Sequence, residues 1–206
     1  LYLATGKDVY RDYLIDNQQN IMHGIQRNGW YLCRIARKFE TLRKDKQAKD
    51  WATAFEEALR SVPASIAQRA SQTPYGVPYQ PSIWGAGWDI QSFGFQQYFL
   101  ISAYPEIFDI NPMLSALNFV LGCHPGSNQA SFASGVGAQS ATVGYGLNRS
   151  DWSYIPGGVI SGTAMIRPDF PELLTWPYLW QQTEYVLGGG SSHYMFLVLA
   201  ARQLCK

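Results

Sequence analysis

The stretch WATAFEEALRSV (Trp51–Val62) decides the fold class of this chain. Its apolar residues recur at intervals of three and four, which places them on one face of an α-helix. They are Trp51, Ala54, Phe55, Ala58, Leu59 and Val62. Charged side chains occupy the opposite face, so the pattern predicts an amphipathic helix that packs on one side only.

The same periodicity extends over residues 1–71, where apolar residues recur between Leu14 and Ile25 and again between Leu32 and Phe39. Prolines and glycines interrupt it between Gln72 and Trp88. We expect further helices at Gln91–Tyr104, Asn111–Gly122 and Ser191–Leu204. In the second of these, Asn111 can cap the start and Gly122 can end the helix. No strand alternates cleanly for more than a few residues, so the chain is predicted to be all-α.

Residues 123–183 form a long predicted loop region that is rich in glycine, serine, proline and aromatic residues. Loops of this length in a compact domain tend to be functional or disordered, and the tryptophan, tyrosine and isoleucine content argues against disorder. Paired helices with elaborate loops at one end suit a helical barrel or toroid.

Composition limits the classes of function. The 206 residues fit one domain or a large piece of one, and 47% are hydrophobic while only 15% are charged. Aromatics make up 15%, and such rings either fill cores or stack on sugars and bases. The net charge of +1 indicates neither nucleic acid nor an anionic membrane as a partner. A basic excess at Arg34–Lys49 is interpreted as a solvated helix face, with a phosphate or nucleic-acid patch as the alternative.

The three cysteines, Cys33, Cys123 and Cys205, are an odd number without CxxC spacing, so neither a disulfide framework nor a zinc site is expected. One disulfide bond between two of the three cysteines stays as an alternative. The longest apolar run, Tyr194–Ala201, is too short to span a membrane. No residue pattern specifies a cofactor or a metal site.

Glu184 is the strongest candidate for acid–base chemistry. It lies between the aromatic run WPYLW (Trp176–Trp180) and the glycine triplet GGG (Gly188–Gly190). A carboxyl among aromatic side chains is partly desolvated, which raises its pKa, and a raised pKa suits a general acid. The alternative is a structural carboxylate that accepts hydrogen bonds from amides of the glycine turn.

Arg149, in GYGLNRSDW (Gly144–Trp152), is the second candidate, because its planar guanidinium can bind sugar hydroxyls or a carboxylate. An ion pair with Asp151 is the alternative. His124 and His193 have no ligand partner at metal spacing and are expected to be structural. Tryptophans that could stack on sugar rings, although each also fits a core, are Trp84, Trp88, Trp152 and Trp176.

Ordered motifs along the chain resemble glycoside hydrolase family 9, the endoglucanase-type cellulases. LNFVLGCHPGSNQASFASGVG (Leu117–Gly137) resembles a helix end and loop of that family. Its matching residues are Leu121, Gly122, Pro125, Ser131, Phe132, Gly135 and Gly137, while His124 replaces the usual asparagine. Arg149 and Ser150 fit a His-His-Arg-x-Ser segment in which Leu147 and Asn148 stand at the histidine positions.

The remaining motifs follow in the family's order. IPGGVISG (Ile155–Gly162) is similar to a glycine-rich loop, and Thr183–Glu184 with the helix HYMFLVLAARQL resembles the segment that carries the family's proton donor. Upstream, SIWGAGW (Ser82–Trp88) resembles a W-G segment before an aromatic-rich helix. The departures indicate a divergent, bacterial-type member.

The resemblance implies a part of an (α/α)6 barrel, a six-hairpin toroid with long loops at one end, with residues 1–206 as the C-terminal portion of one catalytic domain. It also implies inverting hydrolysis of a β-glucan-type or related plant polysaccharide, with Glu184 as the acid and an aspartate as the base. The family's Asp-Ala-Gly-Asp segment has no counterpart here, and the chain opens at Leu1 without Met, so we expect the base to lie in a missing N-terminal part.

A polymeric substrate implies a secreted or periplasmic protein, and a structural calcium is compatible with the resemblance but specified by no residue here. Two other functions stay open. One is a polysaccharide lyase or another helical-toroid hydrolase, which Arg149 beside a uronate would favour. The other is a non-catalytic carbohydrate-binding fragment that keeps the aromatics without a working acid–base pair.

Overall fold

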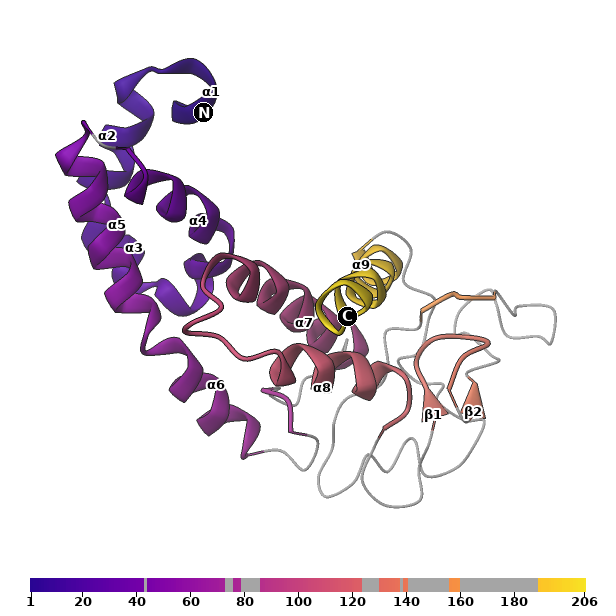
Figure 1. The fold of residues 1–206 in the computed structure, drawn as a ribbon. Helices are drawn as coiled ribbons and strands as arrows, with labels where there is room; N and C mark the ends of the chain where they lie inside the picture. The colour runs from indigo at the N-terminus through magenta and orange to yellow at the C-terminus, as the bar shows by residue number, and fades with distance from the viewer. Residues whose placement is uncertain are drawn as a thin grey trace. The chain divides into compact units, whose positions relative to one another are not determined.

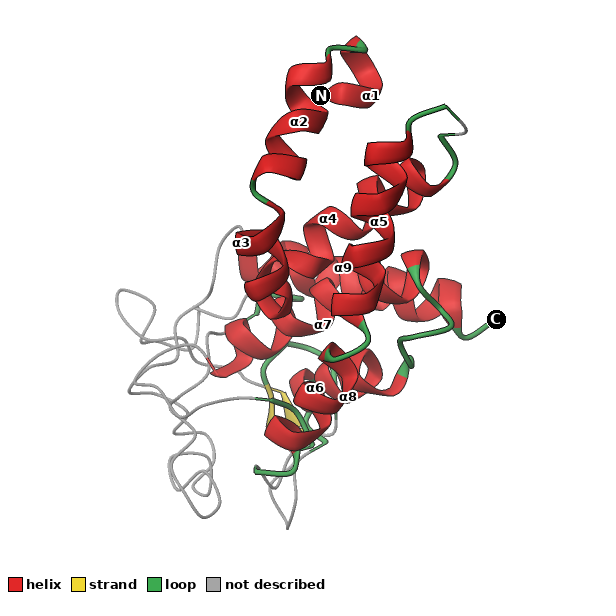
Figure 2. Cartoon of the chain, turned by 90° about the vertical axis from the view of Figure 1, so that its left-hand side faces the viewer, coloured by secondary structure: helices red, strands yellow, loops and turns green. Residues whose placement is uncertain are grey.

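Helices dominate the part of the chain that the structure, a computed structural model, describes. The described residues are 1–42, 44–72, 76–78, 86–123, 130–137, 139–140, 156–159 and 189–206. Helices account for 71% of them, and two strands of two residues each are the remaining regular elements in these ranges (Figure 2). The prediction of a helical chain is therefore confirmed at the level of class.

The helices follow the chain in the order shown in Figure 1. They are α1 (Tyr2–Thr5), α2 (Asp8–Asp16), α3 (Gln18–His23), α4 (Ile25–Glu40), α5 (Lys46–Leu59), α6 (Val62–Ala70), α7 (Ala86–Ala103), α8 (Asn111–Val120) and α9 (Gly189–Leu204). Strands β1 (Ala130–Ser131) and β2 (Gln139–Ser140) pair in parallel, with Ala130 opposite Gln139. Among the described residues, no helix combines the length and apolar character that crossing a membrane requires.

The chain divides into two compact units. The first contains Leu1–Ser65 and Phe99–Asp109, and the second contains Ile66–Tyr98 and Ile110–Lys206. Helices α6 and α7 each contribute residues to both units.

The core of the first unit is the packed pair α4 and α5. Each helix buries five residues along one stripe, as the spacing of three and four predicts. Small residues on α4 let α5 approach closely, because a Cβ added to Gly29 would lie 2.8 Å from Leu59 Cδ2. The Cys33 thiol is fully buried and donates toward the carbonyl oxygen of Trp30 at 3.0 Å, and burial raises its pKa to about 11. Cys33 is therefore an inert packing residue.

Trp51 is the centre of an aromatic cluster in this core. Its ring stacks on Phe55 at 5.1 Å and meets Phe39 edge-on at 5.6 Å between centroids. The indole nitrogen donates to the carbonyl oxygen of Leu14 at 2.9 Å, so the buried N–H is satisfied. The first helix predicted from the sequence thus packs through the apolar face that the sequence indicates.

Part of the basic segment Arg34–Lys49 serves packing. The Arg37 guanidinium lies 3.9 Å above the ring of Tyr104 and pairs with Glu40 at 3.0 Å and with the half-exposed Glu106. The Tyr104 hydroxyl, in turn, donates to Glu40 at 3.1 Å. Arg37 therefore stabilises the end of α7 against α4, and at this residue the segment makes a packing contact instead of a solvated face.

In the second unit, α7, α8 and α9 pack together, with Gly94 at their closest approach. A Cβ added to Gly94 would lie 2.9 Å from Ala116 Cβ on α8 and 3.0 Å from Leu197 Cδ2 on α9. On one side of this point, Phe95 packs edge-on against Phe196 with centroids 4.9 Å apart. The glycine is therefore a packing requirement, although glycine lowers helix propensity.

Replacing Gly94 with alanine is expected to destabilise the protein by about 1–2 kcal/mol, because overpacking outweighs the gain of about 1 kcal/mol in helix propensity. Thermal and urea unfolding of the full chain measure the change. Combining Gly94→Ala with Leu197→Ala removes the side chain that the new methyl group meets, so the two costs should be less than additive. Strict additivity would show that the contact with Leu197 does not limit this position.

Two helix starts and one helix cap differ from the predictions. Helix α7 begins at Ala86 instead of Gln91, because the first turn needs no internal N–H partners and tolerates Gly87. Helix α9 begins at Gly189 instead of Ser191 for the same reason. Asn111 is not the cap, since the capping position is Ile110 and proline occupies the first turn. The predicted helix end at Gly122 is confirmed by its positive φ of 96°.

Candidate functional site

The end of α8 and residues 130–137 form a hydrogen-bonded unit that includes part of the predicted loop region. The amide of Gly122 donates to Phe119 O at 3.1 Å, and the amide of Cys123 donates to Asn118 O at 2.9 Å. This pair of bonds around a left-handed residue is a Schellman motif, which satisfies carbonyls that the helix end leaves open. Leu121-Gly122 therefore stops the helix and turns the chain.

Residues 130–137 fold back against this helix end. The amide of Phe132 donates to Val120 O at 2.8 Å, and the Phe132 ring stacks on Phe119 at 5.3 Å between centroids. Ser131 is fully buried, and its hydroxyl accepts from the amide of Ala133 at 3.0 Å and lies 3.2 Å from Val120 O. The buried serine is thus a structural hydrogen-bonding residue, and Phe132 anchors the loop.

Gly137 lies where no side chain fits. Its φ is +80°, and an added Cβ would lie 2.4 Å from the carbonyl oxygen of Leu121 and 2.8 Å from Ser131 Cβ. Backbone atoms cannot give way as a flexible side chain can, so this position demands glycine for conformation and for space.

A short segment, residues 156–159, pairs with Ala133 and Ser134 of the loop. Ser134 exchanges two backbone hydrogen bonds of 2.8 Å with it, donating to Gly158 O and accepting from the amide of Gly157. Ala133 and Val159, both fully buried, form an antiparallel bridge. Part of Leu117–Gly137 therefore packs directly on part of Ile155–Gly162, two stretches that the sequence marks as motifs.

Helix α9 packs against α7 through aromatic side chains. His193 stacks on Phe95 with centroids 4.8 Å apart, and Tyr98 packs on Phe196 at 5.0 Å. Desolvation lowers the pKa of His193, and its Nδ1 is buried without a hydrogen-bond partner among the described residues. The expectation that His193 is structural agrees with this packing.

Five of the six candidate site residues lie outside the described residues, and these are Glu184, Arg149, Trp84, Trp152 and Trp176. Trp88 lies in the first turn of α7, where only its backbone is described. The structure therefore describes the surrounding helices and turns, and it neither brings these six side chains together nor separates them. Within the described ranges, no group of three or more His, Cys, Asp or Glu residues is placed to hold a metal ion.

Two buried glutamines on α7 were not singled out in the sequence. Gln91 is 0% exposed and Gln97 is 3% exposed, and they lie three residues before and after Gly94 on the side where α7 meets its neighbours. Both amide atoms of Gln91 and the Oε1 atom of Gln97 have no hydrogen-bond partner among the described residues. In the sequence, the run IQSFGFQQ places these glutamines at helical spacing from Gly94, which indicates that they could share its buried face. Buried polar groups normally need hydrogen-bond partners, so such a pair is a recognisable signal.

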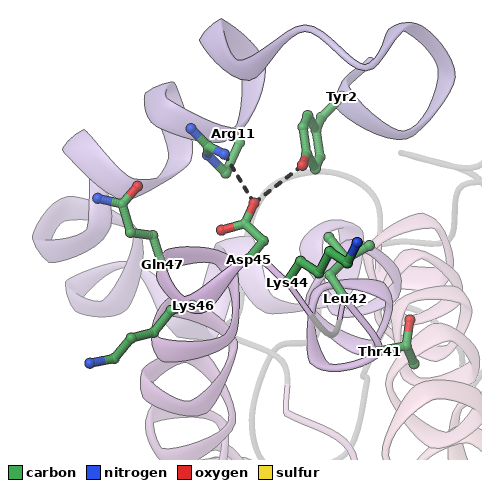
Figure 3. A pocket seen from close by; sticks show the side chains of 8 residues that line it. All are labelled: Tyr2, Arg11, Thr41, Leu42, Lys44, Asp45, Lys46 and Gln47. Atoms are coloured by element: carbon green, nitrogen blue, oxygen red, sulfur yellow. Dashed lines mark hydrogen bonds and ion pairs between the residues drawn. The ribbon is translucent and has the colours of Figure 1, made fainter.

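The first unit contains an open pocket of about 620 Å³ around Asp45, shown in Figure 3. Asp45 lies between Tyr2 and Arg11, while Lys46 and Gln47 point away from it (Figure 3). Its carboxylate accepts from the amide of Ala48 at 3.0 Å, from Arg11 Nη1 at 3.0 Å and from the Tyr2 hydroxyl at 3.2 Å.

The polar groups at the centre of this pocket already satisfy one another. The hydrogen bond from the Ala48 amide, with those from Arg11 and Tyr2, holds the pKa of Asp45 below its ordinary value. Arg11 also pairs with Asp8 at 3.1 Å and with Asp12 at 2.7 Å. The arrangement therefore caps α5 and attaches the N-terminal helices. Among the described residues that line the pocket, no buried side-chain nitrogen or oxygen lacks a hydrogen-bond partner.

Comparison with models of protein families, with curated proteins and with solved structures gave no match to this chain.

Proposed function

We propose that this chain is the C-terminal portion of a six-hairpin, (α/α)6 glycoside hydrolase that cleaves β-glucan-type or related plant polysaccharides with inversion. Glu184 is the general acid in this proposal, and the base is an aspartate from a segment outside these 206 residues. The proposal includes a secreted or periplasmic location, because polymeric substrates of this kind lie outside cells.

The observation that carries the proposal is the folded unit at the end of α8. Six of the seven residues that match the family pattern lie in the described ranges, and they are Leu121, Gly122, Ser131, Phe132, Gly135 and Gly137. Gly122, Gly135 and Gly137 have positive φ values of 96°, 81° and 80°. Ser131 and Phe132 are buried against the helix end. A match that rests on residues with such specific geometric demands is stronger support than a match in composition.

The order of the motifs along the chain adds support. The loop Leu117–Gly137 contacts residues 156–159, and α8 packs against α9, the helix that follows Glu184 in the sequence. Three of the motif stretches thus belong to one compact unit. This arrangement suits a site assembled from loops on a helical scaffold.

The chemistry assigned to Glu184 follows from its sequence setting. An inverting glycosidase needs one carboxylic acid that protonates the leaving oxygen and one carboxylate, about 6.5–9.5 Å away, that activates water. In this proposal, the aromatic run before Glu184 would desolvate the carboxyl, the condition under which a general acid stays protonated near neutral pH. Arg149 is proposed to bind sugar hydroxyls, and the four tryptophans Trp84, Trp88, Trp152 and Trp176 are proposed sugar platforms.

The proposal is tested with a protein that extends the chain at its N-terminus, incubated with β-glucan oligosaccharides. Proton NMR of the first product formed should show the α-anomer, as inversion of a β-linkage requires. An ultraviolet-absorbing unsaturated uronate from acidic polysaccharides would identify a lyase instead. Binding of oligosaccharides without turnover would identify a carbohydrate-binding module. Either result would overturn the hydrolase assignment.

A further inference from the structure

The N-terminal residues 1–16, which comprise α1 and α2, form a segment that we call the N-terminal strap. Neither helix of the strap buries a side chain, whereas α4 and α5 beneath it bury five each. Val9 and Tyr13, one turn apart on α2, are 64% and 67% exposed. The strap therefore gains less from apolar burial than α4 and α5 do, and such burial is the main source of stability for a short helix.

Among the described residues, polar contacts centred on Asp45 join the strap to the rest of its unit. Tyr2 and Arg11 both donate to Asp45 Oδ2, at 3.2 and 3.0 Å, and the Tyr2 ring meets Phe39 edge-on at 5.7 Å. A further hydrogen bond runs from Trp51 Nε1 to Leu14 O, close to the end of α2. The Asp45 carboxylate thus holds Tyr2 and Arg11, while the C-terminal end of α2 is held through the backbone carbonyl of Leu14.

A pivot lies directly after the strap. Asn17, between α2 and α3, has φ −98° and ψ 12°, outside the helical range, so the two helices are not continuous. The Ile21 amide donates to Asn17 O at 3.0 Å on the α3 side of this break, and the Asn17 amide donates to Tyr13 O at 3.2 Å on the α2 side. The Trp51–Leu14 bond lies near this pivot and can persist while Tyr2 and Arg11 separate from Asp45.

We propose that the strap opens as a unit about Asn17, with Asp45 as its latch, while α4 and α5 stay folded. Opening widens the 620 Å³ pocket around Asp45 and uncovers the aromatic surface of Phe39 that Tyr2 covers. Segments with few buried apolar contacts open locally at a free energy well below that of global unfolding. The latch and the α5 cap share the same carboxylate, since Asp45 also accepts from the Ala48 amide. This inference does not depend on the proposed hydrolase function.

Hydrogen exchange of the full 206-residue chain, read by mass spectrometry, tests the strap. Asp45→Asn retains an acceptor for the Ala48 amide but removes the charge that attracts Arg11. We expect amides of residues 8–16 to exchange about tenfold faster than in the parent chain, with α4 and α5 unchanged. Tyr2→Phe, which removes only the hydroxyl, should give a smaller change of about threefold in the same segment.

Glu56→Gln is the matched control, because it breaks the exposed Arg60–Glu56 pair on α5 and touches no part of the strap. It should leave the exchange of residues 8–16 unchanged. Unchanged exchange of these residues in both Asp45→Asn and Tyr2→Phe would overturn the latch. Equal acceleration of α2, α4 and α5 would overturn the strap, because it would mean that the whole unit opens together.

Discussion

Glu184→Gln should reduce the hydrolysis of β-glucan oligosaccharides by the N-terminally extended protein by about a thousandfold. A positioned general acid typically contributes about 10²–10⁴-fold, and the amide of glutamine cannot give a proton to the leaving oxygen. The loss should fall on kcat more than on KM, because the proton is transferred only in the transition state. Initial rates over a range of substrate concentrations measure both constants.

A substrate that needs no acid separates this role from a structural one. An aryl β-glycoside with a weakly basic phenol departs without protonation, so Glu184→Gln should be impaired far less on it than on the oligosaccharide. Glu172→Gln, which changes another carboxyl in the predicted loop region of residues 123–183, should leave both activities near the parent level. Equal losses on both substrates in Glu184→Gln would mean that the carboxylate supports the glycine turn and not the chemistry.

Gly137→Ala should destabilise the protein by more than about 3 kcal/mol. Alanine at φ +80° costs about 1–2 kcal/mol by itself, and its methyl group would lie 2.4 Å from the carbonyl oxygen of Leu121. Relief of that contact requires the loop to leave the end of α8, which would break the Phe132–Val120 hydrogen bond and the Phe119–Phe132 stacking. Urea unfolding monitored by circular dichroism measures the loss.

Gly157→Ala is the matched control for this prediction. Gly157 also has a positive φ, +71°, but an added Cβ would find nothing within 4 Å. Only the conformational cost of about 1 kcal/mol applies there. Similar losses in the two variants would show that the loop is not held against Leu121.

Much of the helical structure follows from local spacing. The stripe of α5 and the end of α8 at Gly122 agree with the sequence because apolar periodicity and a left-handed glycine act within one or two turns. The starts of α7 and α9 were less predictable, since glycines in a first turn look the same as glycines in a loop. Glu184 was reached through its sequence neighbours and the resemblance, without any contact from the described residues.

The sequence by itself determined the helical class and the faces that α4 and α5 bury, because both depend on the order of side chains along one helix. Only the tertiary structure decided that Gly94 and Gly137 are sites of closest approach and that Ser131 returns to Val120. It also decided that Asp45 joins the strap to α5. Several of these contacts link residues far apart in the sequence, such as Arg11 and Asp45 or Gly94 and Leu197. A chain's local preferences do not specify which distant groups share the same space.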